Sequence, residues 1–100
     1  MKAVPILFLI FGAAITFACD HYDFCHCQNS DLSADDAATK AVCAFTSQDY
    51  GGGTQETVMG YVECEYSAGS YDPAISDNCM WADFCKIVGA TGPDSDCRNV

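Results

Sequence analysis

The sequence predicts a small, disulfide-rich α+β sandwich in which two helices pack on a small antiparallel sheet. All eight cysteines fall within the last 82 of the 100 residues, a density typical of a disulfide scaffold. Stretches with the two-residue alternation of strands are interleaved with stretches of helical spacing. Their order is strand, helix, strand, helix and a short final strand, which favours helices and sheet in two layers.

Residues 1–18 have the three parts of a secretory signal peptide. Lys2 supplies a positive charge, residues 4–17 form an uncharged apolar run, and Ala18 is a small residue before the predicted cut. The run is shorter than the ~20 residues that cross a bilayer, so a membrane anchor is disfavoured. We therefore expect residues 19–100 to form one secreted, extracellular domain without membrane insertion.

The mature part is strongly acidic. It holds three of the four basic residues and all 14 acidic ones, so its net charge is −11. Phosphate backbones and anionic membranes would repel such a chain, which argues against nucleic acid as a partner and against membrane-active killing. These charges leave a protein or another cell-surface component as the expected partner.

Four disulfides are expected, because the cysteine count is even and the predicted compartment is oxidising. Eight cysteines allow 105 pairings, and the spacing leaves the pairing open. Each bridge typically contributes about 2–4 kcal/mol, a large share of the stability of so small a domain. A zinc site is disfavoured because one residue separates the closest pair and no second pair of knuckle spacing follows. The cysteines are Cys19, Cys25, Cys27, Cys43, Cys64, Cys79, Cys85 and Cys97.

The first predicted element of the mature chain is a strand over residues 21–28. Alternation places Cys25 and Cys27 on one face. If these cysteines face the core, an aromatic face lies on the outside of the sheet. Exposed aromatic residues often mark a contact surface, although they can also merely cover the far side of a sheet. The residues of this candidate binding face are Tyr22, Phe24 and His26.

A helix is predicted over residues 34–45, with Ser33 as its N-cap. Cys43 lies opposite the apolar stripe of this helix, so either its bridge reaches a segment outside the helix or the helix is shorter. Residues 46–54 contain three consecutive glycines and are expected to form a loop. The stripe expected to face the core is Ala34, Ala37, Ala38, Ala41 and Phe45.

Residues 56–66 have the clearest strand pattern, and this middle segment is long enough for two strands. Glu63 and Glu65 are expected to point away from the core, and Gly60 indicates a bulge or a close backbone contact. Residues 67–73 follow as a loop. The residues expected to face inward are Val58, Val62, Cys64 and Tyr66.

The second helix is predicted over residues 77–88, with Ser76 or Asp77 as its cap. A turn over residues 90–96 and a short strand over residues 97–100 complete the chain. Cys79 lies opposite the apolar stripe, so here too either the bridge reaches a segment outside the helix or the helix is shorter. The stripe is Met80, Trp81, Phe84, Ile87 and Val88.

Candidate contact residues also lie in the loops, where binding residues concentrate. Tyr50 lies in residues 48–54 and Tyr71 in residues 67–73. Trp81, the only tryptophan, is expected to lie in the core, and a role as a binding anchor is the alternative.

Catalytic chemistry is not expected. His21 and Asp23 are similar to the His–Asp pair of secreted phospholipases A2, but no glycine-rich calcium loop precedes them. In a strand His26 points to the other face, so the three residues do not converge on a metal. Oxidised cysteines leave no thiol nucleophile, and the acidic residues are scattered. We therefore predict a protein that is not an enzyme and that needs neither metal nor cofactor.

The chain resembles the small secreted cysteine-rich proteins of filamentous fungi, many of which act as effectors on plants. The leader, the 82 mature residues and the expected bridges carry this resemblance over the whole chain. The Cys25-His26-Cys27 strand, Cys43 near the end of the first helix and the Asn78-Cys79-x-Trp81-x-x-x-Cys85 helix look like the α/β-sandwich killer toxins of smut fungi. Those toxins are normally released at dibasic sites, which this chain lacks.

The resemblance implies a secreted, monomeric, non-catalytic effector. Such a protein would act in virulence or on host defence through a surface patch on an apoplastic or cell-surface target. The alternative is a killer toxin-like or antimicrobial protein that acts on competing microbes.

Overall fold

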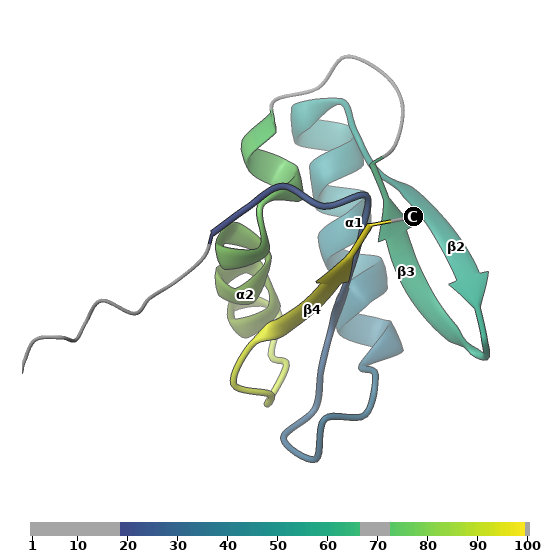
Figure 1. The fold of residues 1–100 in the computed structure, drawn as a ribbon, viewed down its shortest axis with the longest axis vertical. Coiled ribbons are helices and arrows are strands. Elements are labelled where there is room, and N and C mark those ends of the chain that lie inside the picture. The colour runs from purple at the N-terminus through teal and green to yellow at the C-terminus, as the bar shows by residue number, and fades with distance from the viewer. Residues whose placement is uncertain (1–18, 67–72, 100) are drawn as a thin grey trace, which may run out of the picture.

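The computed structural model of the protein describes residues 19–66 and 73–99, and the predicted signal peptide lies outside this range. The strands form one antiparallel sheet in the order β2-β3-β1-β4. Helix α1 packs on β1, β2 and β3, and α2 packs on β1 and β4, so the predicted α+β sandwich is confirmed (Figure 1). The elements are β1 (Phe24–Cys27), α1 (Asp36–Tyr50), β2 (Thr54–Val58), β3 (Tyr61–Glu65), the 3-10 helix η2 (Pro73–Ser76), α2 (Asn78–Ile87) and β4 (Ser95–Arg98).

Four disulfides cross-link the fold, as the cysteine count predicts, and two of them join a helix to the sheet. One bridge joins α1 to β3, one joins β1 to α2, one joins β1 to β4, and one joins the start of the described chain to α2. This framework indicates an oxidising, extracellular environment. The pairs are Cys43–Cys64, Cys27–Cys85, Cys25–Cys97 and Cys19–Cys79.

The core between the layers contains a chain of hydrogen bonds among buried side chains. Trp81 Nε1 donates to the carbonyl of Ile75 at 2.9 Å and to the hydroxyl of Tyr66 at 3.1 Å. The Tyr66 hydroxyl lies 2.8 Å from Thr46 Oγ1, which in turn donates to the carbonyl of Cys43. The polar tips of both aromatic residues are therefore satisfied without water, as burial requires.

Helix α1 differs from its prediction at both ends and in its buried face. Asp35 is the N-cap, with its side chain accepting from the backbone of Ala38, and the helix continues to Tyr50. Of the predicted stripe only Ala38 is buried. The buried residues of α1 are Ala38, Thr39, Val42, Cys43 and Thr46.

Hydrogen bonds made by threonine hydroxyl groups explain why the buried face of α1 differs from the prediction. The Thr39 hydroxyl accepts from the backbone N–H of Cys27 at 2.9 Å and donates to the carbonyl of Asp35 at 2.8 Å. The buried threonine hydroxyl groups all have hydrogen-bond partners. Threonine can therefore take the place of alanine at the interface without leaving a buried polar group unsatisfied. The helix consequently turns Cys43 toward the sheet, which removes the conflict that the sequence pattern raised.

The middle segment is a hairpin, so the two-strand alternative is correct. Met59 and Gly60 have φ angles of 51° and 89°, the left-handed pair of a type I′ turn, and the expected bulge at Gly60 is instead this turn. The loop before β2 begins only after Tyr50. In that loop a Cβ added to Gly53 would lie 2.8 Å from Cys64 Sγ, so the backbone passes too close to the core for a side chain.

Helix α2 begins one residue later and ends one residue earlier than predicted, with Asp77 as its N-cap. Its described buried residues are only Trp81 and Cys85. Met80, Ile87 and Val88 are exposed, which corrects the predicted stripe. Cys79 faces away from the sheet and bridges Cys19 in the segment before β1, so the alternative of a bridge outside the helices is correct here.

None of the helices within the described residues has the length and the apolar character needed to cross a membrane.

Candidate functional site

An apolar groove lies between the C-terminal parts of α1 and α2. Its volume is about 190 Å³. Ile87 is 79% exposed, and Phe45 and Val88 are about two-fifths exposed. The groove is lined by Val42, Phe45, Phe84, Ile87 and Val88.

Aromatic side chains from both helices meet at this groove. The Phe45 ring meets the Phe84 ring edge-on with centroids 5.3 Å apart, and it meets the Tyr50 ring in the same way at 5.5 Å. Tyr50 reaches Phe45 because α1 continues past residue 45 to Tyr50. Edge-to-face pairs of this kind hold rings in fixed orientations. Packed aromatic rings therefore connect α1 and α2 at the groove.

The outer face of the sheet, opposite the helices, holds a polar cluster. Cross-strand register aligns Glu56 with Glu63 and His26 with Asp96, and β1 lies between β3 and β4. Glu63 and His26 are only 1% and 5% exposed. Three carboxylates and one imidazole thus form a single row across the four strands, which we call the outer-face row.

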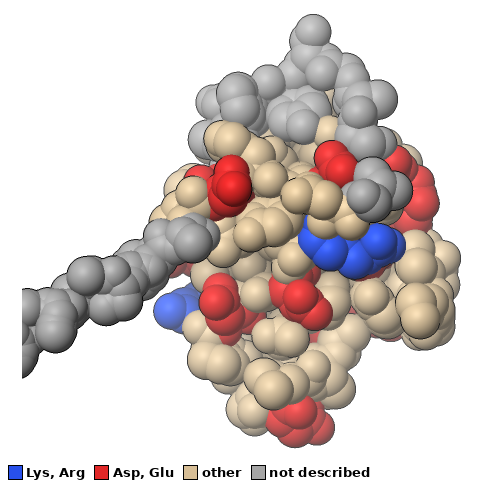
Figure 2. All heavy atoms as spheres, in the orientation of Figure 1, with Lys and Arg blue, Asp and Glu red and all other residues tan. Residues whose placement is uncertain are grey.

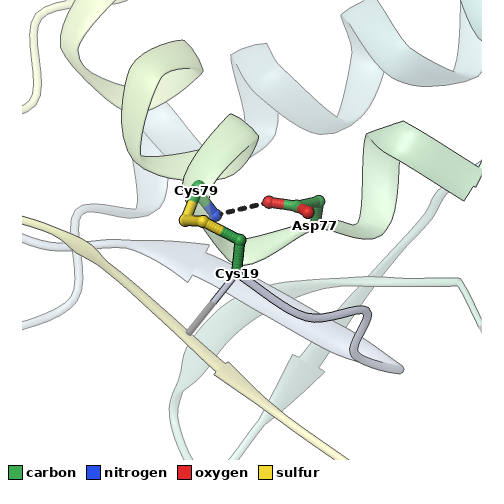
Figure 3. Close-up of side chains that lie close together, drawn as sticks. All are labelled: Cys19, Asp77 and Cys79. Atoms are coloured by element: carbon green, nitrogen blue, oxygen red, sulfur yellow. Dashed lines mark hydrogen bonds between the residues drawn. A yellow bond between two sulfur atoms is a disulfide. The ribbon is translucent and has the colours of Figure 1, made fainter. Parts of the chain in front are cut away.

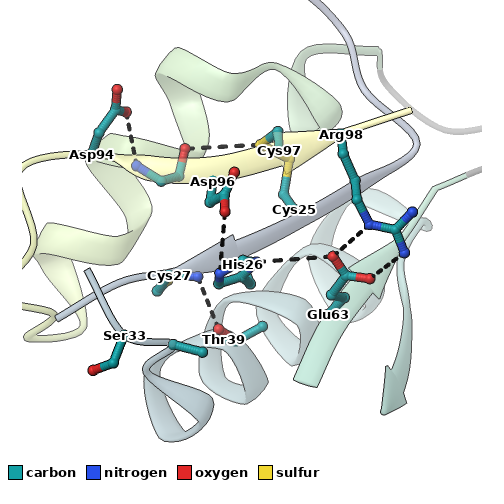
Figure 4. A network of polar contacts seen from close by, with 12 residues as sticks. Cys25, His26, Cys27, Ser33, Thr39, Glu63, Asp94, Asp96, Cys97 and Arg98 are labelled. Carbon is teal, nitrogen blue, oxygen red and sulfur yellow. Dashed lines mark hydrogen bonds and ion pairs between the residues drawn. A yellow bond between two sulfur atoms is a disulfide. The ribbon is translucent and has the colours of Figure 1, made fainter. Parts of the chain in front are cut away.

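Arg98 compensates the buried charge in this row. Its Nε and terminal nitrogen donate to the two oxygens of Glu63 at 3.0 and 2.7 Å, a bidentate pair (Figure 4). The guanidinium also lies 4.3 Å above the Phe24 ring. Such a pair offsets the desolvation of a buried carboxylate, and the hydrogen bonds to Glu63 raise the pKa of Arg98.

His26 lies between two carboxylates in the same row. Its Nδ1 is 3.9 Å from Glu63 Oε2, and its Nε2 is 3.7 Å from Asp96 Oδ2 (Figure 4). The Tyr61 ring covers it at a centroid distance of 4.7 Å. His26 therefore lies at the centre of a structural network of charged side chains.

The carboxyl group of Glu56 lies at the open end of the row. Its pKa is raised above 4.5, first by a hydrogen bond with the Glu65 side chain and then by partial burial and by the charges of Glu65 and Glu63. Arg98 pairs with Glu63, so its charge does not relieve the pair at Glu56 and Glu65. This end of the outer face is therefore rich in negative charge.

The tightest group of metal-ligand side chains within the described residues is Cys19, Asp77 and Cys79. The two sulfur atoms are bonded to each other, and Asp77 accepts from the backbone N–H of Cys79 at 2.8 Å as the cap of α2 (Figure 3). A bridged sulfur is not a thiolate, which metal binding requires. This cluster is a helix cap beside a disulfide and does not serve as a metal site.

The structure separates the predicted binding residues. Tyr22 is half-buried against the core, and Phe24 is 7% exposed beneath Arg98. His26 is buried in the outer-face row, so the expected exposure of this aromatic face is wrong for Phe24 and His26. Tyr50 contacts the ring of Phe45 beside the apolar groove, whereas Tyr71 lies outside the described residues. A binding role for these five residues stays a prediction.

Four of the five groove residues, all but Val42, lie on the helix stripes that the sequence predicts to face the core. Cys85 and Trp81 are the buried positions of this helix. At 100° per residue, Ile87 lies about 160° around the helix from Cys85. Ile87 therefore faces away from the sheet, and the spacing shows this only once Cys85 is known to be buried.

Comparison with protein-family models, curated proteins and solved structures finds no match to this chain. Sequence and structure together define a small cysteine-rich protein with four disulfides and an α+β fold.

Proposed function

We propose that the mature chain is a secreted effector, a non-catalytic binding protein that acts on a host apoplastic or cell-surface protein. The observation that carries this proposal is the apolar groove between α1 and α2, which is exposed on an otherwise acidic domain. Contiguous exposed apolar surface on a small domain typically marks an interaction site.

The size of the groove favours a protein partner. Small-molecule sites usually enclose about 300–1,000 Å³, and this groove encloses about 190 Å³. A volume of that order accepts one large apolar side chain, which is how anchor residues dock at protein interfaces. The partner would insert such an anchor against Phe45 and Phe84.

Disulfides fix both walls of the groove. Cys43 follows Val42 in α1 and is bridged to β3, and Cys85 follows Phe84 in α2 and is bridged to β1. A preformed site loses less conformational entropy on binding than a flexible one. The same bridges occupy the thiols that would otherwise be nucleophiles, and this supports binding over covalent catalysis.

The proposal is tested with the oxidised mature chain, residues 19–100, infiltrated into leaves beside a reduced and alkylated sample. Ile87→Ser removes an apolar side chain from the groove, and Met59→Ser removes one of similar exposure, 91%, from the tip of the hairpin. We expect cell death or an altered defence response from the oxidised protein. Ile87→Ser should require at least about fivefold more protein for the same response.

The matched control decides the role of the groove. Met59→Ser should act like the wild type, and equal losses in both variants would remove the groove from the proposal. If leaves do not respond while competing fungi or bacteria stop growing, the killer toxin-like alternative replaces the effector function.

A further inference from the structure

We propose that β2 is a docking edge for an extended, basic segment of a partner protein, which adds to the sheet as a further strand. This surface is separate from the groove between the helices and goes beyond the function proposed for it. The inference depends on an open strand edge and on the charge beside it.

The edge is open because β2 pairs only with β3. In a hairpin with a two-residue turn, Val58 pairs with Tyr61 through hydrogen bonds, and the bonded pairs recur at every second residue. Gln55 and Thr57 therefore direct their N–H and C=O groups away from β3. Among the described residues these groups have no other hydrogen-bond partner, and Figure 1 shows β2 at the margin of the sheet.

The exposure of β2 fits this role. Three of its five residues are exposed and the other two are half-buried. Five residues provide a ladder of the length usual for strand pairing. A partner strand could therefore pair along the whole of β2 without displacing any described segment.

Charge beside the edge selects the partner. Glu56 and Glu65 lie on the outer face at this end, where Arg98 is engaged by Glu63. Acidic side chains are spread over the face of the molecule shown in Figure 2, with few basic ones. A Lys or Arg at alternate positions of an added strand would lie on the same face as Glu56, where opposite charges on neighbouring strands attract.

The same charge disfavours a second copy of this chain as the occupant. Pairing two β2 strands would bring the Glu56 carboxylates of both copies onto one face, where like charges repel. Charged residues on edge strands are a known protection against self-association. A basic segment is attracted by the Glu56 carboxylate and not repelled by it, so it can pair with the edge where a second copy cannot.

The test is an NMR titration of the ¹⁵N-labelled, oxidised mature chain. The probe is a capped peptide of four Lys-Thr repeats, and its control replaces every lysine by glutamate. We expect the basic peptide to shift the amide signals of β2 and to slow hydrogen exchange at Gln55 and Thr57 at peptide concentrations up to about 1 mM. This readout needs no variant and therefore does not depend on the folding of one.

Three variants sharpen the test. Thr57→Pro removes an outward N–H without removing a ladder bond, and it should weaken the peptide affinity at least about tenfold. Glu56→Gln should weaken it about threefold, and Asp49→Asn, which changes the net charge equally at the end of α1, should leave it unchanged.

Outcomes that overturn the inference are equally definite. They are absent shifts at β2, equal binding of the acidic peptide, unchanged exchange at Gln55 and Thr57, or concentration-dependent dimers that pair through β2. The leaf assay tests the groove through Ile87, and the peptide titration tests β2. A negative result in leaves would not change the titration, so each proposal can fail without the other.

Discussion

Both faces of the sheet bury the residues at their centre, but different forces hold the two faces. The inner face presents Cys25, Cys27 and Cys64, all with 0% exposure, beneath two helices. The outer face has no helix above it in the described residues, yet Glu63 is 1% exposed. Side chains from neighbouring strands, Arg98 above all, cover it instead.

This difference shows that a small sheet can bury the centre of a face without a second layer. The inner face depends on covalent bridges and apolar contact, which respond little to salt or to mild changes of pH. The outer face depends on ion pairs and on carboxyl groups that lie close together, which respond to both. Variants of the two faces should therefore differ in the size and in the solvent dependence of their effects.

The largest effect is expected on the inner face, from joint replacement of Cys27 and Cys85 by alanine. The bridge spans 58 residues, so its loss should lower the free energy of unfolding by about 4 kcal/mol. Guanidinium titration measures this loss. Replacing Cys19 and Cys79, which span 60 residues at an exposed end of the fold, is the matched control. Equal losses would mean that burial adds nothing to the entropic contribution.

Trp81→Phe should have the next largest effect, about 3 kcal/mol. The variant loses indole volume and leaves the carbonyl of Ile75 without the donor that lies 2.9 Å away. The hydroxyl of Tyr66 loses the same donor. Thermal unfolding checks the loss, and an unchanged melting temperature would exclude Trp81 as the centre of the inner core.

On the outer face, Glu63→Gln should lower the melting temperature by about 5 °C at low salt. The amide keeps the shape of the side chain but cannot compensate the charge of Arg98. Asp96→Asn, whose parent side chain is 57% exposed, is the control and should change the melting temperature little. High salt should narrow the gap between wild type and Glu63→Gln. A gap independent of salt would indicate that packing, and not charge, holds this face.

The smallest effect is a change of pH dependence in Glu56→Gln. The folded chain raises the pKa of Glu56 above 4.5, so folding favours the protonated carboxyl. Its contribution is full below pH 4.5 and is lost as the pH rises through the folded pKa. The variant should remove this decline, which unfolding midpoints between pH 4 and pH 7 would reveal. Parallel pH profiles would contradict the shared proton between Glu56 and Glu65.

Much of the fold could be predicted from the sequence because its signals are local. The cysteine count predicted four bridges, and alternation predicted the inward positions Val62, Cys64 and Tyr66, which are all buried. Val58 was predicted on the same face but is half-buried on the outer face, because the hairpin turn lies between it and Val62. Asp77 was one of the two residues predicted to cap α2, because a carboxylate at this position accepts hydrogen bonds from the first backbone N–H groups of a helix.

The predictions that failed concern residues whose surroundings depend on partners far away in the sequence. The buried face of α1 was misplaced because Thr39 is acceptable there only through the backbone of Cys27, twelve residues away. Phe24 was expected to be exposed because the sequence does not show that Arg98 lies above it. The disulfide pairing failed to emerge for the same reason, since it depends on topology and not on spacing.

The pairing of the cysteines also has a consequence for proteolysis. Each bridge joins one of the first four cysteines to one of the last four, and the division falls between Cys43 and Cys64. The most exposed apolar residue of the described chain, Met59, lies in that interval. A protease that cuts the hairpin turn there would release no fragment. The nicked molecule would stay a single covalent species and would separate into two pieces only under reduction.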